Sequence, residues 1–253
     1  MDIDVALVPA QARDWRDTVC VVVDELRASS TITTLLDLGC AGLFLTRGLD
    51  EARRLARQYG LLLAGERRGR TPRGFDLNNS PAELSRADIG GRAIVLSTSN
   101  GTAVLNLLKE MPAVLVGCLL NARACAEAAV GLADSTDARI GIVCAGVGGR
   151  FALDDAVAAG VLVDRLRETI EARSGQVRLS DAALAAARLR AGYPDVTAAL
   201  EESASGHLVR EIGAAEDIRF CARLDASRSV GMLGSGPPMR IDRVGARSLG
   251  PHR

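Results

Sequence analysis

The sequence predicts an α/β fold in which a largely parallel sheet, with a mixed sheet as the alternative, carries helices on both faces. Two observations support this. Short apolar runs rich in β-branched residues recur between residues 18 and 146, and amphipathic helical patterns separate them. Parallel strands need crossover helices, and burial of both faces makes their sequences almost continuously apolar. The alternation therefore favours a sheet of parallel strands.

The first elements follow in a regular order. The run "TVCVVVD" predicts a buried strand at 18–24, and the pattern after it predicts a helix that ends at Gly39. The elements expected next are strand 42–46, helix 49–60 and strand 61–65. A capping box then begins a short helix, because Ser80 is followed by Pro81 and, three residues after the cap, by Glu83.

The second half continues the alternation and then becomes helical. Strands are expected at 93–98, 113–118 and 139–146, and helices at 101–111, 122–133 and 153–173. Residues 180–213 predict further helices, and one or two strands follow them. Since no flexible linker divides the chain, we expect one domain over residues 1–240 and a flexible tail over 241–253.

The composition excludes several classes of protein. Of the 253 residues, 48% are hydrophobic, and Lys+Arg and Asp+Glu total 31 each, so the net charge is zero. With no basic excess and 3% aromatic residues, binding to nucleic acid or to a membrane surface is not expected. The start lacks a signal-peptide layout, and the six cysteines form no C-x-x-C pair. We therefore expect reduced thiols in a cytoplasmic protein.

Four polar loops follow predicted strands, at residues 24–30, 65–69, 97–102 and 144–149. In open α/β sheets, ligands bind beyond the carboxyl ends of the strands. We therefore expect the four loops to share one edge of the sheet and to form a single crevice.

Two of these loops contain residues suited to binding a phosphate group. Asp24 ends an apolar strand, where a carboxylate must be paired, solvated or bound to a metal. Arg27, Ser29 and Ser30 precede a helix whose free N–H groups attract anions. A similar arrangement is expected at Ser99, Asn100, Gly101 and Thr102. Ordinary helix capping and a tight turn are the alternatives for the two loops.

The glycine loop after residue 144 offers a different chemistry. Cys144 and Arg150 have the C-x5-R spacing of cysteine-dependent phosphatases, in which a thiolate attacks phosphorus. Val143 stands where those enzymes have histidine, and Phe151 stands where they have serine or threonine. A cysteine-dependent site is therefore an alternative to a metal-dependent one.

Acidic residues near the four loops are candidate ligands for a hard cation. They are Asp24, Glu66, Asp76, Asp154 and Asp155. Oxygen ligands without a suitable histidine or cysteine favour Mg²⁺ over zinc. Asp154 and Asp155 also begin a predicted helix, where the helix dipole alone is sufficient to explain them.

Four blocks occur together and in order: "VVVDELRASSTI", "GERRGRTPRGFDLNNSPAE", "STSNGT" and "CAGVGGRFALDDAVAAG". With these blocks the chain resembles the 2-phosphosulfolactate phosphatase (ComB-like) family, and a weaker similarity continues in "ASGHLVREIGAAEDIRFCARLD". The resemblance implies a three-layer α/β/α fold. It also implies Mg²⁺-dependent hydrolysis of the phosphate ester of a small sulfonated hydroxy acid, in the coenzyme M pathway. Glu25, Asn78 and Gly231 depart from the family's pattern, which puts the substrate in question.

Together, these observations predict a phosphatase with Asp24, Arg27 and Asp154 as catalytic residues. Asp24 would activate water or attack phosphorus, and Mg²⁺ would be held by Asp24, Glu66, Asp76, Asp154 and Asp155. Arg67 would bind the second anion of the substrate. The other expected substrate-binding residues are Ser29, Ser30, Asn79, Ser80, Ser99, Asn100, Gly101, Thr102, Cys144 and Gly146. The alternatives are the cysteine-dependent phosphatase and a protein that binds a phosphorylated or dianionic metabolite without turnover. A homodimer is also considered.

Overall fold

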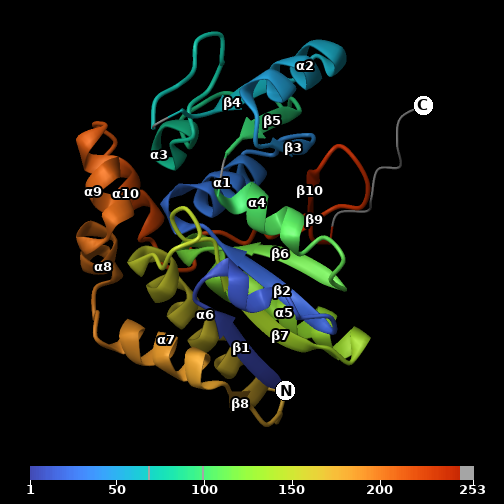
Figure 1. Cartoon of the computed structure of the whole chain (residues 1–253), viewed down its shortest axis with the longest axis vertical. Helices are drawn as coiled ribbons and strands as arrows, with labels where there is room; N and C mark the ends of the chain where they lie inside the picture. The colour runs from blue at the N-terminus through green and yellow to red at the C-terminus, as the bar shows by residue number, and fades with distance from the viewer. Residues whose placement is uncertain (68, 99, 246–253) are drawn as a thin grey trace.

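The computed structural model describes residues 1–67, 69–98 and 100–245. Its core is a ten-stranded sheet with the order β4-β5-β3-β10-β9-β6-β2-β7-β1-β8 (Figure 1). The strands are β1 (Asp2–Ala6), β2 (Thr18–Val23), β3 (Leu43–Thr46), β4 (Leu62–Gly65), β5 (Ile94–Ser97), β6 (Ala113–Gly117), β7 (Arg139–Cys144), β8 (Arg178–Leu179), β9 (Gly231–Leu233) and β10 (Arg240–Arg243). The helices are α1 (Ser30–Asp37), α2 (Leu49–Tyr59), α3 (Pro81–Leu84), α4 (Asn100–Leu107), α5 (Ala122–Thr136), α6 (Leu153–Glu171), α7 (Asp181–Ala191), α8 (Val196–Glu202), α9 (Ala204–Glu211) and α10 (Glu216–Cys221).

The sheet is mixed and consists of two parallel blocks, β4-β5-β3 and β6-β2-β7-β1-β8. Between them lie β10 and β9, and the pairs β3–β10, β10–β9 and β9–β6 are all antiparallel. Three successive reversals make the two blocks run in opposite directions. The loops after β2 and β7 therefore leave a different edge of the sheet from those after β4 and β5. This corrects the expectation that all four loops share one edge.

The twist of the sheet nevertheless brings the two sets of loops together. Five steps separate β5 from β2 in the sheet order. Neighbouring strands rotate by about 20–25°, so the accumulated rotation is on the order of 100°. As a result, the start of α4, which follows β5, reaches the end of β2. There the Gly101 N–H donates a hydrogen bond of 2.8 Å to the Asp24 carboxylate.

β2 lies inside the larger block and is buried on both faces. Val19, Val21 and Val23 pack with residues of α5 and α6 on one side. Cys20 and Val22 pack on the other side with residues of α1 and α4. Helices on both faces explain why this strand has no polar alternation. They also confirm the expected three-layer α/β/α architecture.

The two ends of the sequence contain strands that the patterns did not reveal clearly. In β1, Asp2 and Asp4 alternate with the buried Ile3 and Val5. The two acids made this strand difficult to identify from the sequence. Ile241 is buried within β10, which pairs with β3 and β9. The domain boundary expected at residue 240 therefore falls inside a strand, and residues 246–253 of the expected tail lie outside the described part of the chain.

The helices between residues 181 and 221 bring distant sequence close to the end of β2. In Figure 1, α8, α9 and α10 form a column on one side of the molecule, near α3. α10 contacts both α3 and the π-helical turn at Glu25–Ser29, which directly follows β2. Across the described ranges, no helix has both the length and the apolar character that a membrane crossing requires.

A buried carboxyl group, that of Glu25, joins the end of β2 to the loop after β6. Its Oε2 accepts a hydrogen bond of 3.0 Å from the Leu119 N–H, and its Oε1 accepts one of 3.1 Å from the Ser30 hydroxyl. Burial raises the pKa of Glu25 from its ordinary value of 4.5 to about 8, and the charges of Asp154 and Asp24 add to this rise. Between pH 4.5 and about pH 8, Glu25 therefore holds a proton in the folded protein and has released it in the unfolded chain.

We expect the folded state to lose stability as the pH rises from about 4.5 to about 8. The contribution of the Glu25 proton is complete below the unfolded pKa and is lost as the pH rises through the folded pKa. It amounts to at most about 5 kcal/mol. Glu25→Gln keeps a neutral side chain of the same shape, so its free energy of unfolding should change less with pH. Urea unfolding of both proteins across this range measures the difference, and parallel profiles would contradict the prediction.

Candidate active site

A cavity of about 280 Å³ lies where the loops after β2, β4 and β5 meet α9. Its polar wall includes Asp24, Arg27, Glu66, Asn79, Asn100 and Ser205. Its apolar wall includes Leu26, Val147, Leu208, Val209 and Ile212. Five residues singled out from the sequence therefore meet in one place, although they come from opposed blocks of the sheet.

Asp24 is the most constrained of these residues. Its Oδ2 accepts the hydrogen bond from Gly101, and its Oδ1 accepts one of 3.3 Å from the Ala28 N–H. A Cβ atom on Gly101 would lie 3.1 Å from the Asp24 carboxylate, so glycine lets the α4 backbone approach this acid. Burial raises the pKa of Asp24, the two backbone hydrogen bonds lower it, and the nearby charge of Glu66 raises it further.

Glu66 follows β4 and faces the same cavity. Its Oε2 accepts a hydrogen bond of 2.6 Å from the Gly69 N–H, which fixes the turn after the strand. The charge of Glu66 raises the pKa of Asp24, because two oxygen donors of like charge lie near each other. Such a pair favours the binding of a cation.

The two acids at the start of α6 differ from each other. Asp155 accepts hydrogen bonds of 2.8 Å from the backbone N–H groups of Glu25 and Gly146, so both of its oxygens bind loop backbone. Asp154 has a buried Oδ1 without a hydrogen-bond partner among the described residues. Burial raises the pKa of Asp154 to about 6, a hydrogen bond from Ser205 opposes this rise, and the charge of Asp24 adds to it.

The five acids expected around Mg²⁺ do not form one cluster. Asp76 is exposed, and its Oδ2 accepts a hydrogen bond of 2.8 Å from the Leu63 N–H, which places it along β4 rather than in the cavity. Asp155 is not among the residues that line the cavity. Over residues 1–67, 69–98 and 100–245, no three His, Cys, Asp or Glu side chains are grouped so that they could hold a metal ion. Asp24 and Glu66 remain as the acids that face the cavity.

Arg27 lines the cavity but is nearly inaccessible, with 4% of its side chain exposed. Its Nη1 donates a hydrogen bond of 2.7 Å to Asp217 of α10. Asp217 had no role in the sequence-based prediction, and neither did Ser205, although both lie in the weakly similar block "ASGHLVREIGAAEDIRFCARLD". The similarity of that block to the family was the only signal for Ser205 and Asp217 in the sequence. The two residues reach the site through the packing of α9 and α10.

Three of the predicted substrate-binding hydroxyls serve the protein itself. The Ser29 hydroxyl accepts a hydrogen bond of 2.9 Å from the Asp24 N–H, and Ser30 donates to Glu25. Ser80 caps α3 by accepting from the Glu83 N–H, and it donates a hydrogen bond of 2.7 Å to Asp217. These residues therefore position the loops instead of lining the cavity.

The other predicted substrate-binding residues are divided. Asn79 and Asn100 line the cavity, and the Oδ1 of Asn79 and the Oγ1 of Thr102 are buried without a partner among the described residues. Arg67 is exposed, and its backbone pairs with that of Arg70, so it is not part of the cavity wall. Ser99 lies outside the described residues.

The glycine loop after β7 does not form the predicted cysteine-dependent site. The Cys144 thiol is fully buried, and burial raises its pKa well above the ordinary value, which suppresses the thiolate. Arg150 is exposed, and its backbone N–H and C=O pair with those of Val147. Gly146, at φ +64°, donates to Asp155 and passes so close to Arg150 that a Cβ atom would clash with its carbonyl oxygen. Neither Cys144 nor Gly146 lines the cavity.

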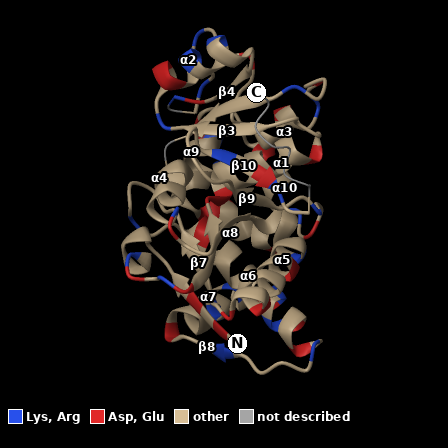
Figure 2. Ribbon diagram, turned by 90° about the vertical axis from the view of Figure 1, so that its right-hand side faces the viewer, with Lys and Arg blue, Asp and Glu red and all other residues tan. Residues whose placement is uncertain are grey.

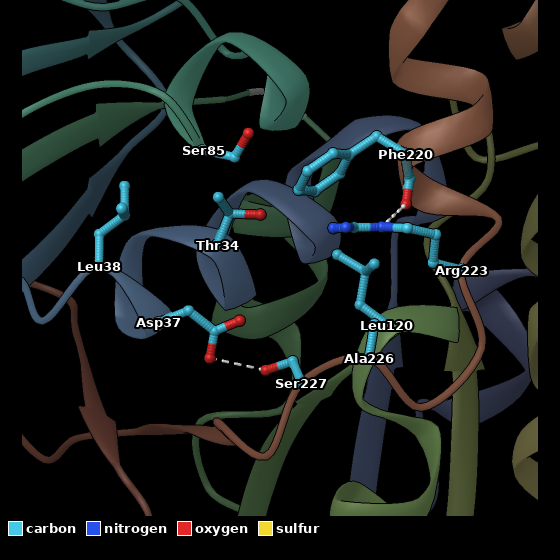
Figure 3. Close-up of a pocket in the computed structure, with 9 residues that line it drawn as sticks. All are labelled: Thr34, Asp37, Leu38, Ser85, Leu120, Phe220, Arg223, Ala226 and Ser227. Atoms are coloured by element: carbon cyan, nitrogen blue, oxygen red, sulfur yellow. Dashed lines mark hydrogen bonds between the residues drawn. The ribbon is translucent and has the colours of Figure 1, made fainter.

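A second cavity of about 230 Å³ contains none of the predicted site residues. Figure 3 shows Arg223 lying under the ring of Phe220, and the guanidinium carbon is 3.8 Å from the ring centre. Asp37 on the opposite side accepts a hydrogen bond of 2.8 Å from Ser227. This cavity lies at the far end of α10 from Asp217, so it is separate from the candidate active site.

Most of the acidic side chains around the candidate active site are buried. Figure 2 shows many charged residues on outer helices and loops, with further acidic segments near the centre of the view. The buried acids are Asp24, Glu25, Asp154, Asp155 and Asp217. Because buried carboxyl groups are costly without partners, their concentration here is typical of a functional site.

Comparisons with known proteins identify the family of this chain. The family model described as 2-phosphosulpholactate phosphatase matches residues 6–236. A probable 2-phosphosulfolactate phosphatase of Deinococcus radiodurans is 38% identical over 220 residues, which cover 86% of this chain and 88% of the relative. Proteins with the same description from Thermus thermophilus and Thermotoga maritima are 36% and 34% identical, over 92% of this chain and 94% and 96% of their own lengths. The chain belongs to the 2-phosphosulfolactate phosphatase family.

Proposed function

We propose that this protein is a Mg²⁺-dependent phosphatase that hydrolyses 2-phosphosulfolactate to sulfolactate and phosphate, in a coenzyme M-type pathway. The descriptions of its relatives support the substrate. The observation that carries the chemistry is the placement of Asp24, Glu66 and Arg27 on the wall of one cavity. Two acids and a guanidinium suit a cation and a phosphoryl group together.

The residues present fit a magnesium ion. Asp24 and Glu66 supply hard oxygen donors whose charges repel each other, and a cation would relieve this repulsion. Mg²⁺ keeps several waters and is usually held by one or two protein carboxylates together with substrate phosphate oxygens. When bound, the ion would neutralise charge that develops on the phosphoryl oxygens. Asp76 and Asp155 are not needed in this arrangement.

The protein's own groups divide the remaining work. Arg27 would orient the phosphoryl group through charge-assisted hydrogen bonds. Asn79 and Asn100 would donate to the other anionic groups of the substrate, a role first expected of Arg67. Asp24 would attack phosphorus or take the proton of the attacking water. Its Oδ1 and Oδ2 are already oriented by the N–H groups of Ala28 and Gly101.

Asp154 is the proposed proton reservoir. Its pKa of about 6 lets this carboxyl group gain and lose a proton near neutral pH. Ser205 lines the cavity, and its hydroxyl lowers the pKa of Asp154, so it connects this buried acid to the cavity. The proton given up by water would pass to the leaving oxygen, so that the products are the free alcohol and phosphate.

The six free thiols support the expected cytoplasmic location.

Asp24→Asn should lower the rate of phosphate release by about 10²–10⁴-fold, because the amide loses the charge needed to bind the cation and to accept a proton. The measurement is phosphate release from a panel of phosphorylated three-carbon acids, with and without Mg²⁺. Asp76→Asn is the matched control, since it makes the same change at another acid that was expected to hold Mg²⁺ but lies outside the cavity, and its activity should stay near that of the wild type.

Full Mg²⁺-dependent turnover by Asp24→Asn would refute the assignment of this residue. If the wild type binds these acids in calorimetry but releases no phosphate over hours, the protein is a binder without turnover and the proposed phosphatase activity is wrong.

Cys144→Ser should leave phosphate release near the wild-type rate, and EDTA should abolish the activity of both proteins. The reason is that the buried thiol does not reach the cavity. Burying a hydroxyl in place of the thiol should cost about 1–3 kcal/mol of stability, which thermal unfolding will detect. Activity that survives EDTA and disappears in a folded Cys144→Ser protein would instead establish the cysteine-dependent mechanism.

A further inference from the structure

Asp217 is a buried carboxylate that connects three parts of the candidate active site. Its Oδ2 accepts the hydrogen bond of 2.7 Å from Arg27, and its Oδ1 accepts one of 2.7 Å from the Ser80 hydroxyl and one of 3.0 Å from the Ala82 N–H. No part of its side chain is exposed. It therefore joins the turn after β2 to the start of α3, from a helix 190 residues further along the chain.

The hydrogen bond to Asp217 leaves most of the Arg27 guanidinium available. Nη1 is bound to Asp217, and the other N–H groups of this side chain make no hydrogen bond with the described residues. Because a guanidinium is planar and rigid, fixing one nitrogen strongly limits the directions of the others. The free N–H groups belong to a residue that lines the cavity.

Without Asp217, the acids of the cavity would compete for Arg27. The positive charge of Arg27 already lowers the pKa of Asp24, so the two side chains interact. Within the described residues, however, Arg27 forms an ion pair with Asp217 and not with Asp24. Asp217 thus keeps the guanidinium from neutralising the carboxylate that the proposed chemistry needs.

A role in docking α10 alone does not account for this arrangement. The neighbouring Glu216 already ties α10 to the loop after α3, through two hydrogen bonds of 2.7 Å with Arg86 at the surface. A buried ion pair carries a desolvation cost that an apolar contact would avoid. The buried pair of Arg27 and Asp217 therefore indicates that the site requires the charge of Arg27 and a fixed direction of its guanidinium.

We propose that Asp217 is a positioning residue that directs the Arg27 guanidinium toward the phosphoryl group of the ligand. This inference rests on the proposed function in assuming that the cavity takes a phosphate ester. It goes beyond that function by assigning the orientation of Arg27 to a residue that does not touch the substrate. If Asp217 acts through Arg27, then the loss of Asp217 does not weaken phosphate binding further in a protein that already lacks Arg27.

The experiment is a double-mutant cycle with Arg27→Gln, Asp217→Asn and the double variant. Calorimetry with inorganic phosphate gives the dissociation constant, and phosphate release gives kcat and KM. Each single substitution should weaken phosphate binding by about 10- to 100-fold, the loss expected for one charge-assisted hydrogen bond. The double variant should bind phosphate no more weakly than Arg27→Gln alone. Glu216→Gln, which removes the surface tie of the same helix, should leave binding unchanged.

The comparison of the double variant with Arg27→Gln does not require that Asp217→Asn fold. Removing both charges leaves no unpaired guanidinium in the interior, and circular dichroism will check that both proteins are folded. A further loss of about tenfold or more in the double variant would overturn the proposal, because Asp217 would then act independently of Arg27. A wild type that does not bind phosphate would also overturn it. Phosphate binding with no turnover would contradict the proposed function and leave the cycle as a valid test of Asp217.

Discussion

The site depends on one requirement, namely that carboxyl groups removed from water at the end of β2 must find hydrogen-bond donors. The donors come from the loops after other strands. Gly101 after β5 donates to Asp24, Leu119 after β6 donates to Glu25, and Gly146 after β7 donates to Asp155. Each buried acid therefore holds a different loop in place. Asp24 also lines the cavity, so this acid both holds a loop in place and contributes to the polar wall.

The apolar side of the cavity has an electrostatic role. Leu26, Leu208 and Ile212 line the cavity together with its charged residues, and apolar side chains offer water no hydrogen bonds. Charges interact more strongly when less water surrounds them, so the effect of Asp24 and Arg27 on a bound anion is increased. A cavity lined on all sides by charged residues would bind its ligand in a more strongly screened environment.

Local patterns predicted the strands and helices of the parallel blocks well, because buried strands and amphipathic helices have distinct periods. Of the residues that they singled out, Asp24, Arg27, Glu66, Asn79 and Asn100 line the cavity. They could not reveal the opposed directions of the blocks, since strand order is set by long-range pairing. For the same reason Asp217 was missed, while Asp76 and Asp155 were given to a metal because their backbone donors are invisible in a sequence. The magnesium ion itself stays a prediction.

The position of β9 and β10 has a consequence for how the chain is made. These are the last strands in the described part of the chain, yet they occupy the middle of the sheet and connect its two blocks. During synthesis, which proceeds from the N-terminus, no strand pairing joins the two blocks until residue 243 has left the ribosome. A chain that stops earlier presents unpaired edges at β3 and β6, which are templates for aggregation. In the complete chain β10 pairs with β3 and β9 pairs with β6, so these exposed edges belong to incomplete chains.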